Sequence, residues 1–122
     1  MLFNNHTPIY LQIAELLYQK ILSGEYKNAS RIPSVRDMAV TLEVNPNTVT
    51  RSYMILQEEG VIENRRGIGY YTNEDAARIV EKKKQKEFLE SEVPSFFARM
   101  DQLGLSLNEV LEHLETRKGT IQ

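Results

Sequence analysis

The first apolar stripe of the chain recurs at helical spacing and predicts a helix over residues 8–23. Thr7 is expected to cap this helix, Pro8 suits its first position, and Gly24 is a natural end. The apolar positions on one face are Ile9, Ile13, Leu16, Leu17 and Ile21. We interpret this stripe as part of the core.

Two shorter stripes follow, separated by a tight turn. Ser34 and Asp37 match a capping box that opens a helix over residues 34–42. A second helix is predicted over residues 46–59, and it ends at Gly60. The positions expected to be buried are Val35, Met38, Ala39 and Leu42 in the first helix and Val49, Tyr53 and Leu56 in the second. Two short helices joined in this way form a helix-turn-helix motif.

After Gly60 the pattern changes to two brief β segments. Residues 61–62 and 69–72 are expected to be strands, with residues 64–67 between them. A helix-turn-helix followed by a small basic hairpin is a winged helix. We therefore predict a mainly α fold with a small β-hairpin, in which residues 1–73 form a winged helix-turn-helix DNA-binding domain.

Residues 74–122 differ in character and are predicted to be largely helical. Asn73 can cap the first helix, and a capping box at Ser106 opens the last one. Pro94 predicts a kink or a break near Val93. A dense apolar set at helical spacing consists of Phe88, Leu89, Val93, Phe96, Phe97, Met100 and Leu103.

This apolar set is larger than one thin helix pair can hide internally. An exposed apolar patch of that size usually marks an interface. We therefore expect residues 74–122 to form a short α-helical dimerisation region. The alternative is that the apolar set packs back onto the winged helix.

The distribution of charge along the chain says more about nucleic-acid binding than the net charge does. The net charge of −2 argues mildly against nucleic-acid binding. Acidic and basic side chains balance in residues 1–73, so the negative excess lies wholly in residues 74–122. Every arginine of the first region falls between positions 31 and 66, and phosphate-binding surfaces depend on such local clustering.

Composition excludes several other classes of protein. The chain has no cysteine, which excludes disulfides, thiolate metal sites and cysteine nucleophiles. No apolar run approaches the roughly 20 residues that span a bilayer, and no signal peptide is visible. His6 and His113 lack ligand spacing. We expect a cytoplasmic protein with no membrane association, no metal and no cofactor.

The start of the helix over residues 46–59 is more polar than capping requires. Asn45 as the cap and Pro46 at the first position are sufficient to initiate it. In a helix-turn-helix this end enters the DNA major groove, where Asn can pair with adenine, Arg with guanine, and Thr with several partners. A merely well-capped surface helix is the alternative. The polar surplus consists of Asn47, Thr48, Thr50 and Arg51.

Further candidates for DNA contact flank this helix. Arg36 lies in the first turn of the preceding helix, where it either contacts DNA or pairs with Asp37 or Glu43. Arg31 offers the same choice from a loop. A hairpin tip suits phosphate or minor-groove contact, although an Arg-Arg turn is usually just solvated. The predicted tip carries Arg65, Arg66 and Gly67.

Four motifs, in order, resemble the DNA-binding domain of the GntR family of bacterial transcription regulators. They are P-I-Y-L-Q-I, then S-R-I-P-S-V-R-D-M-A, then V-N-P-N-T-V-T-R-S-Y-M-I-L-Q-E-E-G-V-I, then R-R-G-I-G-Y-Y. Together they cover residues 7–72. The short two-helix tail resembles the small YtrA-type branch, whose regulators commonly accompany ABC-transporter genes.

The resemblance implies a transcriptional regulator, in our interpretation a repressor, that binds a palindromic operator in double-stranded DNA as a homodimer. Two-fold symmetry would place two recognition helices about 34 Å apart. The family often has glycine where Ser30 stands, preceded here by Asn28 and Ala29, so the path of this loop is open. The full set of predicted DNA contacts is Arg31, Ser34, Arg36, Asn45, Asn47, Thr48, Thr50, Arg51, Arg65, Arg66, Gly67 and Gly69.

A protein-interaction adaptor and an enzyme are the two alternative classes of function. Winged helices also serve as protein-interaction adaptors without sequence-specific DNA binding. An enzyme is not expected, because the acidic residues of the first region surround no nucleophile and no catalytic triad can be built. A small-molecule effector could bind at the dimer interface, but no residue identifies one.

Overall fold

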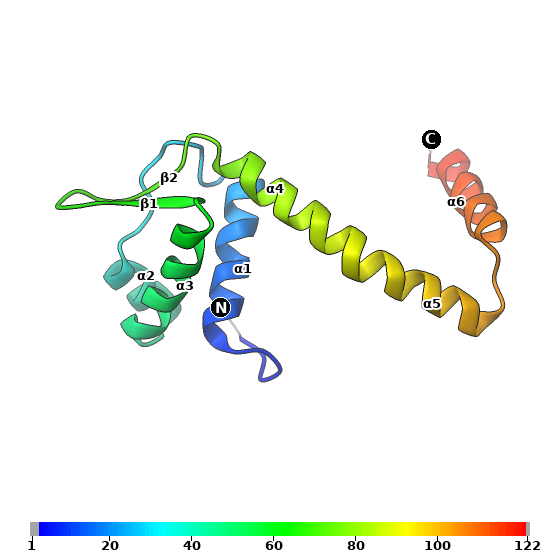
Figure 1. The fold of residues 1–122 in the computed structure, drawn as a ribbon, viewed down its shortest axis with the longest axis horizontal. Coiled ribbons are helices and arrows are strands. Elements are labelled where there is room, and N and C mark those ends of the chain that lie inside the picture. Colours follow the sequence, from blue (N-terminus) through cyan, green and yellow to red (C-terminus); the bar gives the residue numbers. More distant parts are fainter. Residues whose placement is uncertain (1–2, 122) are drawn as a thin grey trace. The chain divides into compact units, whose positions relative to one another are not determined.

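The computed structural model describes residues 3–121 and divides them into two compact units (Figure 1). The first unit extends through Lys83, and the second begins at Lys84. The first contains α1 (Ile9–Leu22), α2 (Val35–Leu42), α3 (Pro46–Glu58), β1 (Ile62–Arg65), β2 (Gly69–Thr72) and most of α4 (Ala76–Glu87). The second continues with the π-helical turn η1 (Phe88–Glu92), α5 (Val93–Leu103) and α6 (Leu107–Ile121). The predicted mainly α fold, with a winged helix and a small hairpin, is confirmed.

The start of α1 differs from the prediction. The N-cap is Pro8 rather than Thr7, and the Pro8 carbonyl accepts the Leu11 N–H at 3.1 Å. The chain before the helix is fixed by Gln12, whose Nε2 donates to the carbonyl oxygens of Asn4 and Thr7 at 2.9 and 2.7 Å. Gln12 therefore anchors the segment before the helix, while the first turn of α1 has no side-chain cap.

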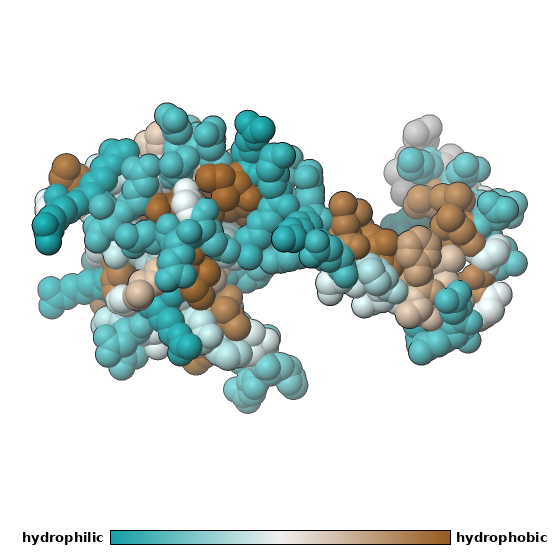
Figure 2. Space-filling model, viewed as in Figure 1, coloured by the Kyte–Doolittle hydropathy of each residue, from teal (hydrophilic) through white to brown (hydrophobic). Residues whose placement is uncertain are grey.

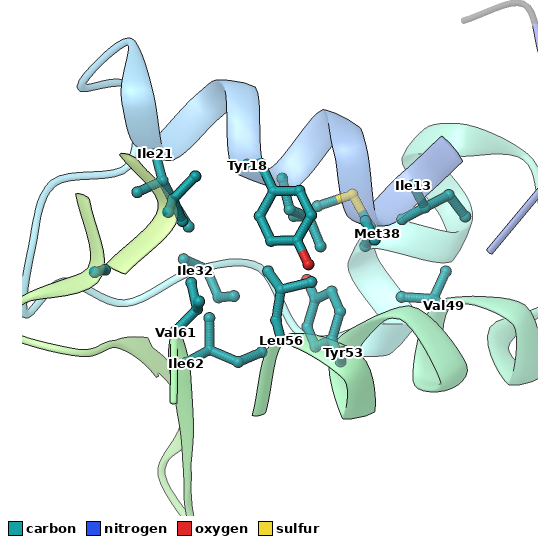
Figure 3. Close-up of a cluster of buried hydrophobic side chains, with 14 of the residues drawn as sticks. Ile13, Tyr18, Ile21, Ile32, Met38, Val49, Tyr53, Leu56, Val61 and Ile62 are labelled. Atoms are coloured by element: carbon teal, nitrogen blue, oxygen red, sulfur yellow. The ribbon is translucent and has the colours of Figure 1, made fainter. Parts of the chain in front are cut away.

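The core lies where α1 and α2 pack against α3 (Figure 3). Tyr53 of α3 is fully buried, and its ring meets the ring of Tyr70 in β2 edge to face, with centroids 4.9 Å apart. Its hydroxyl donates to the Pro33 carbonyl oxygen at 2.7 Å. Burial raises the pKa of the Tyr53 hydroxyl, so it stays protonated and able to donate. One side chain thus ties α3 both to the hairpin and to the segment before α2.

The hairpin is antiparallel, and its first strand is longer than predicted. Ile62 pairs with Thr72, and Arg65 pairs with Gly69. Arg65 is therefore a strand residue and not part of the connection between the strands. The segment before α2 adds a further extended piece, because the Thr72 N–H donates to the Ser30 carbonyl at 2.8 Å.

The loop that departs from the family pattern has a defined path. Ala29 adopts a left-handed φ of +54°, a conformation that glycine takes at lower cost. Asn28 places its Oδ1 to accept the Ala77 N–H at 3.0 Å, and Asn73 Oδ1 accepts the Asp75 N–H at 2.8 Å. The two asparagines supply acceptors to the otherwise unpaired N–H groups at the start of α4.

The first turns of α4 belong to the winged-helix core. Ala76 and Val80 are fully buried in the same cluster as the α1 and α3 side chains. The compact unit therefore continues to Lys83, beyond the boundary at residue 73 expected from the sequence. The apolar face at the start of this helix completes the core of the first unit.

The second unit has no helix break at the proline. Pro94 is the second residue of α5, and the preceding turn widens into a π turn in which the Val93 N–H bonds the Phe88 carbonyl. A wider turn gives the proline ring room that an α turn does not. The predicted capping box is present, since Ser106 Oγ accepts the Glu109 N–H at 3.2 Å and Glu109 Oε2 accepts the Ser106 N–H at 3.3 Å.

Candidate nucleic-acid interface

The start of α3 is capped within the chain, which leaves its next residues exposed. Asn45 is the N-cap, and its Oδ1 accepts the Asn47 N–H at 2.8 Å. Asn47 is exposed, whereas Thr48 and Thr50 are half-buried. The cap is therefore satisfied without DNA, and the polar groups beyond it remain at the surface.

Arg51 is held by an aromatic ring from α1. Its guanidinium carbon lies 3.8 Å from the centroid of the Tyr10 ring, within cation–π range. Arg51 is exposed and, within residues 3–121, has no carboxylate partner. The neighbouring Ser52 is fully buried and donates its hydroxyl to the Tyr10 carbonyl oxygen at 2.6 Å.

The start of α2 presents an exposed arginine. Ser34 caps the helix, with its Oγ accepting the Asp37 N–H at 3.0 Å. Arg36 is exposed, and it pairs with neither Asp37 nor Glu43 in the described part of the chain. The structure therefore favours a free guanidinium over the ion pair that the sequence left open.

The wing turns sharply at its tip. The Ile68 N–H donates to the Arg65 carbonyl at 2.8 Å, and Gly67 has a φ of +77°, as a type II turn requires. Arg66 is exposed in this turn and, in the part of the chain that the structure describes, has no ion-pair partner. The tip thus offers a guanidinium beside an accessible backbone.

Two further arginines, Arg65 of the wing and Arg31 of the segment before α2, are supported by the sheet. Arg65 lies over the Tyr71 ring at 4.0 Å and has its Nε 3.6 Å from Glu63 Oε2, an exposed pair that adds little stability. Arg31 forms a β-bridge with Tyr71, and its guanidinium lies across Gly69. A Cβ at Gly69 would come within 3.2 Å of Arg31 Nε and would require this side chain to shift slightly, and the φ of +138° at this position favours glycine.

The predicted DNA-contact residues thus fall on the starts of α2 and α3 and on the wing, and Tyr53 connects these three elements. Sequence reasoning missed Tyr10 and Tyr71 as supports for arginines. The register could have indicated Tyr71, because it pairs with Glu63, two residues from Arg65. Tyr10 had no such signal, since its contact with Arg51 depends on how α1 packs against α3.

The second unit presents apolar side chains on its surface, several of which are visible as brown patches in Figure 2. Of the predicted interface set, Met100 is buried and Val93 is half-buried. The exposed members are Phe88, Leu89, Phe96, Phe97 and Leu103. Further exposed leucines follow at Leu105, Leu107, Leu111 and Leu114.

A groove of about 480 Å³ lies between α5 and α6. Its lining is mainly apolar and includes Phe96, Met100 and Leu103, together with Arg99 and His113.

Within residues 3–121, no three His, Cys, Asp or Glu side chains gather as a metal site would require. In the same range, no helix is long and apolar enough to cross a bilayer.

Comparison with known proteins gives consistent matches. The family described as bacterial regulatory proteins, gntR family, matches residues 9–71. The uncharacterized HTH-type transcriptional regulator YhcF of Bacillus subtilis is 40% identical over 93% of this chain and 93% of its own length. The HTH-type transcriptional repressor YtrA of the same organism is 44% identical over 57% of this chain and 54% of its own length.

Two of the solved structures that resemble this chain each cover 93% of its length. A GntR-family transcriptional regulator from Listeria monocytogenes is 32% identical, covers 93% of this chain and 98% of its own, and has a TM-score of 0.77. A proposed GntR-family regulator from Bacteroides thetaiotaomicron is 40% identical, covers 93% of this chain and 99% of its own, and has a TM-score of 0.80.

Proposed function

This chain is a transcriptional regulator that belongs to the GntR family of bacterial regulatory proteins, and we propose that it binds a palindromic operator in double-stranded DNA as a homodimer. The start of α3 enters the major groove, where Asn47, Thr50 and Arg51 contact base edges. The wing contacts the flanking phosphates or the minor groove. Such a function places the protein in the cytoplasm, with the bacterial chromosome.

One observation carries this proposal. Arg36, Arg51 and Arg66 stand exposed on α2, α3 and the wing, and in the described part of the chain no carboxylate neutralises any of them. Exposed cations without acidic partners are what phosphate contact requires, since each contact replaces a condensed counterion. Their neighbours are short polar side chains suited to base edges.

The other predicted contacts take supporting roles in the same interface. Ser34 and Asn45 accept backbone N–H groups, and the hydroxyl and the amide N–H₂ can still donate to phosphate oxygens. Gly67 allows the wing backbone to approach DNA closely, and Gly69 leaves room for the Arg31 guanidinium beside it. Arg65 supplies positive charge on the wing, where it lies over the Tyr71 ring, and Arg31 adds charge beside the wing from the segment before α2.

The second unit supports the homodimer. Its exposed apolar side chains are more numerous than a monomer usually leaves in water. A two-fold axis through this unit would pair two winged helices, with the recognition helices about 34 Å apart on successive turns of the major groove. The palindromic operator follows from that symmetry.

We extend the proposal to repression of an operon that encodes an ABC transporter. The named repressor YtrA shares 44% identity over 70 residues, which are 57% of this chain and 54% of its own length. Finding an ATPase gene of a transporter beside the gene for this chain would support the extension. Activation of a reporter promoter by the chain, instead of silencing, would contradict the repressor assignment.

The experiment that tests DNA binding uses the full chain and a pool of random-sequence duplexes. We expect the chain to select an inverted repeat, with an affinity that falls steeply between about 50 and 200 mM salt. A DNase footprint on the promoter of its own operon should contain that repeat. Selection of no sequence, together with salt-independent retention, would favour the alternative of a protein-interaction adaptor.

A further inference from the structure

We propose that Tyr10 is a positioning residue for DNA recognition, because its ring fixes the orientation in which Arg51 meets the operator. This inference rests on the proposed function of α3 as the recognition helix. Tyr10 itself lies on α1, outside the helix-turn-helix, and it belongs to none of the predicted contact positions. Its role is therefore indirect and acts through Arg51.

The geometry of the pair is that of a stacked cation. The Arg51 guanidinium carbon lies 3.8 Å from the Tyr10 ring centroid, well inside the roughly 6 Å limit for cation–π attraction. At such a distance a planar guanidinium covers the ring face. Arg51 has no acidic partner among residues 3–121, so the ring is the feature of the fold that orients it.

Tyr10 is fixed independently of Arg51. Its carbonyl oxygen accepts the Ser52 hydroxyl at 2.6 Å, and Ser52 is fully buried between α1 and α3. Ser52 also directly follows Arg51 in α3. The backbones that carry the ring and the guanidinium are therefore held together directly next to the contact.

Stacking leaves the useful edge of Arg51 free. The N–H groups of a guanidinium point outward in its own plane, so a ring against one face does not block them. Bidentate contact with guanine O6 and N7, or with a phosphate, uses those in-plane donors. A side chain oriented before binding loses less rotamer freedom on binding, which strengthens the complex.

Tyr10 is suited to this role because it is not a core residue. It is half-buried and lies outside the cluster of buried side chains that holds the winged helix together. Substitution of the ring is therefore expected to leave the fold in place. The hydroxyl of Tyr10 offers a competing explanation, since tyrosine hydroxyls also donate to phosphates.

The test uses the duplex that the full-length wild-type chain selects from a random pool, with affinity measured by fluorescence anisotropy at about 150 mM salt. Tyr10→Phe keeps the ring and should bind within about 2-fold of wild type. Tyr10→Leu removes the stacking partner and should weaken binding by about 3- to 10-fold. The loss should concentrate at one base pair of each half-site when single-base variants of the duplex are compared.

Arg51 variants provide the matched control. In an Arg51→Ala background, Tyr10→Leu should cause no further loss, because the side chain that it positions is gone. Arg51→Lys keeps the charge but gives up the planar group, and should lose the same base preference as Tyr10→Leu. Thermal melting of each variant checks that the fold is retained. Arg51→Lys leaves Tyr10 on α1 unchanged, so any loss of base preference comes from the arginine alone.

Several outcomes would overturn the inference. An unchanged affinity of Tyr10→Leu, or an equal loss in the presence and absence of Arg51, would show that the ring does not act through the arginine. A loss with Tyr10→Phe as large as with Tyr10→Leu would assign the effect to the hydroxyl. Failure of the wild type to select any duplex would remove the proposed function, and this role with it.

Discussion

At the scale of single residues, the exposed arginine at the start of α2 is the sharpest probe of DNA binding. Arg36→Ala should weaken operator binding by about 10- to 100-fold, because a lost guanidinium contact costs roughly 1–3 kcal/mol. Anisotropy at about 150 mM salt measures this in a range where weak exposed-charge effects are already screened. Arg117→Ala removes the same charge from α6 and should bind like wild type. Equal affinity of the two variants would disprove the assignment of Arg36.

Residue types indicated candidate contacts, but not how each is held. The sequence leaves the path of the Arg31 loop open, and the structure bridges Arg31 to Tyr71 and places its guanidinium beside Gly69. The sequence predicts Arg51 as a DNA contact from its residue type and position, and the structure adds that it stacks on Tyr10. In both cases the partner is distant in sequence, so no local pattern could reveal it.

At the scale of elements, α4 differs most from the prediction, because its start belongs to the winged-helix core and not to the second region. Its start completes the winged-helix core, since Val80 is fully buried there. Val80→Ala should lower the free energy of unfolding by about 1–3 kcal/mol, because a buried branched side chain leaves a cavity. Urea denaturation followed by circular dichroism measures the change.

The control for that substitution lies two residues further along the same helix. Lys82 is exposed, and Lys82→Ala should change the free energy of unfolding by no more than about 0.5 kcal/mol. If Val80→Ala were as mild as Lys82→Ala, then α4 would not contribute to the core, and the compact unit would end with the hairpin instead.

At the scale of the whole molecule, the apolar second unit carries the proposed dimer. A chain truncated after Lys83 keeps Ala76 and Val80, so we expect it to stay folded and to sediment as a monomer. A cut after Thr72 would be a poorer test, because it removes both buried residues. Circular dichroism checks folding, and sedimentation equilibrium of the truncated and full-length chains gives their masses.

The truncated monomer should also lose most of its affinity for an operator with two half-sites. Its affinity for a single half-site should equal that of one subunit of the full-length dimer. Linked binding of two heads raises affinity by a large factor through effective concentration alone. A truncated chain that still sediments as a dimer would move the interface to the winged helix.

Periodicity and capping alone determined most of the secondary structure. The three helices of the winged-helix core agree with α1, α2 and α3 within about one residue at each end. Their signals are local, because proline, glycine and a capping side chain act on adjacent backbone groups. The family resemblance, the placement of arginines near residues 31 to 66 and the absence of cysteine also follow from the sequence by itself.

The tertiary structure decided what depends on distant contacts. It extended β1 to include Arg65, because cross-strand pairing with Gly69 sets where a strand ends. It carried the compact unit on to Lys83, because burial of Val80 requires α1 and α3 beside it. It also set Tyr10 against Arg51, because only the packing of α1 on α3 brings residues 41 positions apart into contact.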